Sequence, residues 1–140
     1  MKHLIVCALL LLSIAATAQN KDEQAIKKIL ANQEAAWNDV RLDKFMIGYW
    51  NNDSLLFIGK NGPNYGYDNT LKNYQKSYTD TSVMGHFTSS VISIKRLSKE
   101  YYFVTGKWFL KRTVGNISGY YTLLFHKIKG EWVIIADHSS

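Results

Sequence analysis

The sequence has little cysteine and little proline. Cys7 is the only cysteine in 140 residues, and Pro63 is the only proline. Because Cys7 lies in an apolar N-terminal stretch that we expect to be removed, the remaining chain has no thiol for a disulfide, a nucleophile or a cysteine-ligated metal. No linker rich in glycine or proline and no repeat divides the sequence, so we predict a single domain held together by packing.

The sequence also lacks an N-terminal apolar run long enough to cross a bilayer. The apolar stretch of residues 4–16 is shorter than the ~20 residues that a spanning helix needs. It follows the basic Lys2 and leads into Ala16-Thr17-Ala18, a small-x-small pattern typical of a cleavage site. We therefore predict a secretory signal peptide over residues 1–18. The single domain, residues 19–140, is then exported to the periplasm or the medium.

Charge is not concentrated in any segment. The formal net charge is +6, but the lysines and arginines occur as scattered pairs rather than as a run. This distribution is typical of a solvated surface and, together with export, argues against nucleic acid as a partner. The histidines lack the spacing of a metal site, and neither a phosphate loop nor a nucleophile elbow is visible. We expect no metal, no cofactor and no membrane partner after cleavage.

Apolar residues recur near helical spacing in the first half of the chain. The pattern predicts an amphipathic helix over residues 21–38, a second over residues 42–50 and a third from Asp68 to about Tyr78. Turn-forming residues separate the second and third helices and flank a short strand at residues 55–58.

From His86 onward the apolar period changes from helical to alternating. Strands are predicted over residues 86–97, 100–113, 119–129 and 131–138, with links so short that neighbouring strands must pair antiparallel. Helices first and strands last indicate an α+β fold. Both faces of the last three strands are apolar, and one layer of helices covers only one of them. We predict that the other face is buried in a homodimer.

The order of these elements resembles the nuclear transport factor 2-like (NTF2-like) superfamily, and within it the SnoaL-like and DUF4440 branches. The resemblance implies a cone-shaped, cystatin-like fold in which three N-terminal helices pack on a curved, mostly antiparallel sheet. A ligand pocket lies at the open end of such a cone. Members include isomerases, cyclases, dehydratases and epoxide hydrolases as well as proteins without catalysis, so the fold alone does not fix a function. The segments that carry the resemblance are Ala35-Ala36-Trp37-Asn38, Asp53, Gly66, Gly106-Lys107-Trp108-Phe109-Leu110, Gly119-Tyr120-Tyr121-Thr122-Leu123, Glu131-Trp132-Val133-Ile134 and Asp137-His138-Ser139-Ser140.

The last predicted strand ends on an acid and an imidazole. Strict side-chain alternation places Trp132, Ile134, Ala136 and His138 on one face and Asp137 on the other. By analogy with the usual Trp-x-Ile pattern we place His138 inward. There it either serves as an acid–base group or pins the strand end as a hydrogen-bonded core residue. Asp137 is then structural or lies at an interface.

Asp53 is a second candidate catalytic residue, although capping a turn is its alternative role. We expect a mostly apolar pocket with a few polar points, because tyrosines add hydroxyl groups to an aromatic wall. Three functions remain open: an exported domain that binds a small, mostly apolar ligand, a cofactor-free isomerase or hydrolase-like enzyme that uses His138 with Asp53 or a tyrosine, and an interaction protein acting through its sheet face. The predicted lining residues are Trp37, Tyr49, Trp50, Tyr67, Tyr74, Tyr78, Trp108, Tyr121 and His138.

Overall fold

The computed structural model describes residues 21–140, so the predicted signal peptide, residues 1–18, lies outside the described residues. A helix over residues 21–38 is followed by the short helix α2 (Leu42–Phe45) and the 3-10 helix η1 (Met46–Gly48). Two short strands and two helices come next: β1 (Leu56–Gly59), β2 (Gly62–Tyr65), α3 (Tyr67–Ser77) and α4 (Thr81–Met84). Four long strands complete the domain: β3 (His86–Arg96), β4 (Tyr101–Lys111), β5 (Ile117–Ile128) and β6 (Glu131–Ser139).

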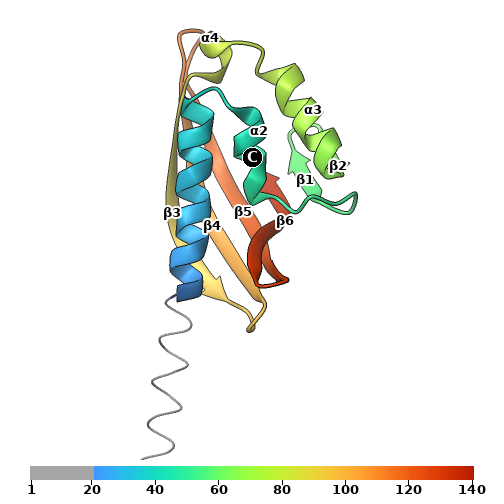
Figure 1. The fold of residues 1–140 in the computed structure, drawn as a ribbon. Helices are drawn as coiled ribbons and strands as arrows, with labels where there is room; N and C mark the ends of the chain where they lie inside the picture. The colour runs from blue at the N-terminus through green and yellow to red at the C-terminus, as the bar shows by residue number, and fades with distance from the viewer. Residues whose placement is uncertain (1–20) are drawn as a thin grey trace, which may run out of the picture.

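The strands form one sheet in the order β2-β1-β6-β5-β4-β3. The four long strands pair antiparallel in chain order, whereas β1 pairs parallel with β6 and antiparallel with β2. The helices gather on one face of this sheet, as Figure 1 shows. The predicted α+β fold and its antiparallel meander are thus confirmed.

The predicted count of three N-terminal helices is not confirmed. The structure has an additional short helix, α4, which begins where the Asp80 carboxylate accepts hydrogen bonds from the backbone N–H groups of Ser82 and Val83. Asp80 is therefore an N-cap residue of the usual kind. The sequence predicts that Asp68 caps the third helix, but this helix starts at Tyr67: Gly66, at a φ of 94°, occupies the N-cap position, and Asp68 lies within the first turn.

The core lies between the first helix and the inner face of the long strands. Ile26, Leu30 and Trp37 are buried on the sheet side of that helix, opposite fully buried strand residues such as Tyr102 and Phe125. The alternation predicted for β4 and β5 is confirmed, because inward residues are buried while residues such as Phe103 and Tyr120 are exposed. No helix within residues 21–140 is long and apolar enough to cross a membrane.

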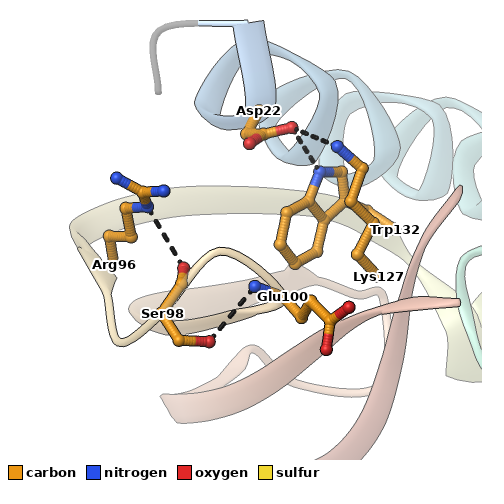
Figure 2. A network of polar contacts seen from close by, with 6 residues as sticks. All are labelled: Asp22, Arg96, Ser98, Glu100, Lys127 and Trp132. Carbon is orange, nitrogen blue, oxygen red and sulfur yellow. Dashed lines mark hydrogen bonds and ion pairs between the residues drawn. The ribbon is translucent and has the colours of Figure 1, made fainter. Parts of the chain in front are cut away.

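The start of the first helix is tied to the sheet at the end of the domain opposite α4 (Figure 1). The Asp22 carboxylate accepts hydrogen bonds from Lys127 Nζ at 2.9 Å and from Trp132 Nε1 at 3.0 Å, as Figure 2 shows. The Lys127 ammonium also lies 5.4 Å from the centre of the Trp132 ring, within the range of a cation–π contact. These contacts hold the start of the helix against Lys127 on β5 and Trp132 on β6.

Candidate functional site

A cavity of about 1000 Å³ opens between the inner face of the sheet and the helices. Side chains from the first helix, α3, the β1–β2 turn and all four long strands line it. Six of the predicted lining residues do so, namely Trp37, Tyr49, Tyr74, Tyr78, Trp108 and Tyr121. The aromatic side chains therefore surround a cavity of drug-sized ligand dimensions instead of filling it.

The helix side of the cavity is a cluster of aromatic rings in edge-on contact. The Trp37 ring lies 4.7 Å from that of Tyr78 and 5.3 Å from that of Phe45, with interplanar angles of 76° and 69°. Phe45 in turn contacts Tyr74 at 5.2 Å. Edge-to-face packing of this kind adds to the burial of apolar area and holds each ring in one orientation. The wall is consequently rigid as well as apolar.

On the sheet side, a glycine lets one tyrosine cross the neighbouring strand. Tyr121 on β5 is paired with Gly106 on β4, and a Cβ at Gly106 would lie about 2 Å from the Tyr121 hydroxyl and ring. The missing side chain allows the Tyr121 hydroxyl to reach Ser89 on β3, with an O···O distance of 2.9 Å. Gly106 thus sets the position of a polar point inside the cavity.

The polar centre of the cavity is Asp137, which is only 4% exposed. Its Oδ2 accepts a hydrogen bond from the Tyr49 hydroxyl at 2.7 Å, and its Oδ1 accepts one from Ser139 Oγ at 2.8 Å. The Tyr74 hydroxyl interacts with that of Tyr49 and extends this chain of polar groups toward α3. Within the described residues, Asp137 carries the only side-chain carboxylate that lines the cavity.

Burial raises the pKa of Asp137 from its ordinary 3.8 to about 6, although the hydrogen bonds from Tyr49 and Ser139 and the nearby His138 act in the opposite direction. Burial also raises the pKa of Tyr49 and of Tyr74 well above 10, and the Asp137 charge adds to both increases. The tyrosine hydroxyls therefore stay protonated as hydrogen-bond donors. The carboxyl, in contrast, changes its charge within one unit of neutral pH.

The expectation that His138 faces the cavity is wrong. His138 is exposed and Asp137 is buried, the reverse of strict alternation. The cause is an irregularity in the β5–β6 pairing, where Leu124 pairs with Ala136 but the next residue, Phe125, pairs with Ile134. The skipped residue, Ile135, is a β-bulge, and a bulge shifts every following side chain to the opposite face.

Three other predicted site residues also lie elsewhere. Asp53 is exposed in the turn before β1, where the neighbouring Asn52 side chain accepts the turn hydrogen bond from Ser54 N. Trp50 is half-buried, and its backbone N–H donates to Ile134 O. Tyr67 is half-buried at the start of α3. None of the three lines the cavity.

Sequence reasoning missed further polar residues of the cavity. Ser89 could have been found by continuing the alternation of β3 inward from Phe87, and Arg112 by continuing that of β4 from Trp108 through Leu110. The inward position of Asp137 could not be predicted in the same way, because no glycine or proline in the sequence indicates the bulge that turns this side chain inward.

Trp108 Nε1 is one of two buried side-chain polar atoms within residues 21–140 that lack a hydrogen-bond partner.

No group of three or more metal-ligating side chains is present in the described part of the chain. The cavity itself contains one side-chain carboxylate and no histidine among its lining residues. The arrangement places a buried carboxyl, with two hydrogen-bond donors, in an aromatic enclosure.

Comparison with solved structures identifies the superfamily. An NTF-2-like protein of unknown function from Shewanella oneidensis MR-1 is 40% identical over 85% of this chain and 98% of its own, with a TM-score of 0.81. The chain belongs to the NTF2-like superfamily. No protein-family model matches it, and a search of curated proteins finds no match, so the DUF4440 branch stays a prediction.

Two more distant solved structures share the fold. A ketosteroid isomerase-like protein from Erwinia carotovora atroseptica SCRI1043 is 16% identical, with coverage of 84% of this chain and 93% of its own and a TM-score of 0.64. A type 2 hexachlorocyclohexane dehydrochlorinase is 12% identical, with coverage of 89% and 88% and a TM-score of 0.70. At such identities the likeness establishes the fold and leaves the chemistry open.

Proposed function

We propose that this NTF2-like protein binds a small, mostly apolar molecule in the cone and holds one polar group of that molecule at Asp137. The observation that carries the proposal is the cavity of about 1000 Å³, whose wall is largely aromatic and whose one side-chain carboxylate is buried. Binding pockets for small molecules combine an apolar lining with a few well-placed polar groups in this way. The open cavity therefore favours ligand binding over a structural role in which the cone is filled by its own side chains.

The proposal is tested by filling the cavity from inside. Ile117 lines the cavity at the start of β5, and Ile117→Trp adds an indole to that space. Ile92→Trp is the matched control, because Ile92 lies on β3, is 63% exposed and does not line the cavity. Native mass spectrometry of the purified protein is expected to detect a retained small molecule in the wild type and in Ile92→Trp, but not in Ile117→Trp.

A fluorescent apolar probe gives a second readout when no molecule is retained. Pyrenebutanol is expected to bind the wild type and the Ile92→Trp control with equal affinity, and to bind Ile117→Trp at least about tenfold more weakly. Equal probe binding by both variants would show that the cavity is not the binding site. Absence of any binding to the wild type would refute the proposed function.

The second candidate function is proton transfer, and the pKa of Asp137 favours it. A carboxyl with a pKa of about 6 is largely ionised at pH 7 yet basic enough to accept a proton from a bound substrate. The adjacent Tyr49 hydroxyl, with its raised pKa, remains a donor to the carboxylate. In this candidate Asp137 takes the acid–base role that the sequence assigned to His138, and no cofactor is required.

Proton transfer is measured as exchange of acidic C–H protons of small ketones in deuterated water, followed by NMR. If Asp137 is the base, the exchange rate rises with pH through about 6 and then levels off, because the ionised form is the active one. Asp137→Asn is expected to reduce the rate at least ~100-fold, whereas Asp53→Asn leaves it unchanged. Exchange that survives in Asp137→Asn would exclude this role.

We further propose export after removal of residues 1–18 and a homodimer formed through the outer face of the sheet. A row of paired residues crosses five strands on this face: Phe103, Leu124, Ala136, Leu56 and Tyr65. Phe103 and Tyr65 are 36% and 58% exposed, so the row presents apolar area to solvent. Such a face is typical of an interface between protein chains.

A further inference from the structure

The charged residues that line the cavity differ in sign according to their exposure. Three basic residues line the cavity: Lys60 in the β1–β2 turn, Lys76 in the last turn of α3 and Arg112 directly after β4. Lys60 and Lys76 are exposed, and Arg112 is half-buried. The one acidic residue of the lining, Asp137, is fully enclosed. The positive charge of the lining therefore lies on solvent-accessible side chains, and the negative charge of Asp137 lies on a buried one.

None of the three cations is neutralised by an acidic side chain. The two ion pairs within residues 21–140 join Arg41 with Asp43 and Lys127 with Asp22, both outside the cavity. Arg112 Nε donates a hydrogen bond to Gly115 O at 2.7 Å, and this bond positions the side chain. The two terminal guanidinium nitrogens of Arg112 have no protein acceptor among the hydrogen bonds of residues 21–140. Those two nitrogens form the planar fork that binds a carboxylate with two parallel hydrogen bonds.

Arg112 continues the inward row of β4. Trp108, Leu110 and Arg112 occupy alternate positions and all line the cavity, so they face the same space over roughly 14 Å of strand. The row presents an unpartnered indole N–H, an aliphatic side chain and a cation in sequence along the strand. Its pattern matches an elongated molecule that is apolar for most of its length and anionic at its outer end.

We propose that the ligand class of this cavity is an amphiphilic carboxylic acid, with its apolar body in the aromatic cone and its carboxylate on Arg112, supported by Lys76 and Lys60. This inference rests on the proposed binding function and specifies its ligand. The fork of Arg112 supplies two parallel donors to a planar carboxylate, while the two lysines add charge without fixed geometry. The buried carboxyl of Asp137 already accepts hydrogen bonds from Tyr49 and Ser139, and the anionic end of the ligand is held at Arg112 instead.

The test compares two probes with the same apolar body, pyrenebutyric acid and pyrenebutanol, by fluorescence titration at pH 8 and low salt. The wild type is expected to bind the acid at least about tenfold more tightly than the alcohol. Arg112→Gln should remove this preference by weakening acid binding at least about tenfold more than alcohol binding, whereas Arg112→Lys should retain part of it. Arg41→Gln, at an exposed arginine outside the cavity, is the matched control and should behave as the wild type does.

Lys76→Gln is a second test variant, which applies even if Arg112→Gln does not fold. Lys76 is exposed and forms no ion pair among residues 21–140, so its substitution should not disturb the fold. It should weaken acid binding about two- to threefold and leave alcohol binding unchanged. Equal affinity of the wild type for acid and alcohol would overturn this inference and leave the proposed function intact. A preference that persists in both variants would also overturn it. If neither probe binds, the proposed function fails as well.

Discussion

At the scale of single residues, Asp137 carries the chemistry of the cavity. Its carboxyl is buried among aromatic side chains and keeps two hydrogen-bond donors, so burial costs it more free energy than the hydrogen bonds return. A residue of this kind destabilises the folded chain whenever it is ionised. Such a cost is typical of functional groups, which are retained for binding or reaction rather than for stability.

The cost predicts how stability depends on pH. The folded-state pKa of about 6 lies above the ordinary 3.8, so the folded protein binds more protons between these values and its stability falls as pH rises from about 4 to 6. Asp137→Asn removes this loss. Relative to the wild type, the free energy of unfolding of the variant should increase by ~2–3 kcal/mol between pH 4 and pH 7.

Urea unfolding at a series of pH values measures this difference. Asp53→Asn is the control, because Asp53 is an exposed carboxyl in a turn and the same substitution there should leave the pH profile parallel to that of the wild type. If the profile of Asp137→Asn also stays parallel to that of the wild type, burial does not raise the pKa of Asp137, and this prediction is wrong.

At the scale of elements, β6 shows where sequence patterns stop being informative. Alternation correctly predicts that Trp132 and Ile134 face inward, and it predicts the two faces of β4 and β5. It fails after Ile135, because the bulge there depends on how β6 meets β5 and not on any residue preference. The sequence therefore predicts the strand β6 correctly, but it does not predict that Asp137 on this strand points into the cavity.

The crossing of β4 by Tyr121 leads to a prediction about Gly106. A methyl group at this position would overlap the Tyr121 ring, so Gly106→Ala should displace the ring, break its hydrogen bond to Ser89 and lower the free energy of unfolding by ~1–3 kcal/mol. Thr105→Ala, at the adjacent outward position, should cost less. Equilibrium denaturation of both variants checks this order.

A second substitution separates overlap from a general effect on the strand. In a Tyr121→Leu background the methyl group at Gly106 has less to displace, so Gly106→Ala should be less destabilising there than in the wild type. Equal costs in the two backgrounds would mean that Gly106 matters for the strand backbone and not for the position of Tyr121.

At the scale of the whole molecule, the fold is predicted well because many local signals agree. The change from helical to alternating period marks where β3 begins, and short links force the meander that the structure contains. The parallel pairing of β1 with β6 has no such local signal, since it joins residues far apart in the chain. The same applies to the cavity, whose existence depends on how all the elements meet.

The proposed homodimer is a property of the complete sheet. Leu124 lies in the outer row between Phe103 and Ala136, and Leu124→Lys would place a charge in the middle of the interface. Analytical ultracentrifugation at micromolar concentration is expected to show a dimer for the wild type and a monomer for this variant. Leu97→Lys, at a position 53% exposed beyond the end of β3, should remain dimeric.

A monomeric wild type at these concentrations would contradict the proposed interface. Binding of pyrenebutanol is the companion measurement, because the cavity opens on the inner face and the Leu124 row lies on the outer one. Leu124→Lys should therefore retain probe binding even when it no longer dimerises.

The close approach of Ser140 to Gly119 has a practical consequence for handling the protein. A Cβ at Gly119 would overlap the backbone of Ser140, whose N–H donates to Tyr120 O, and Ser140 itself lines the cavity. An affinity tag or fluorescent protein fused after Ser140 would therefore begin inside the binding site and compete with whatever enters it. The first helix begins beside Lys127, toward the other end of β5 from Gly119, so immobilisation or labelling from that end stays away from Ser140.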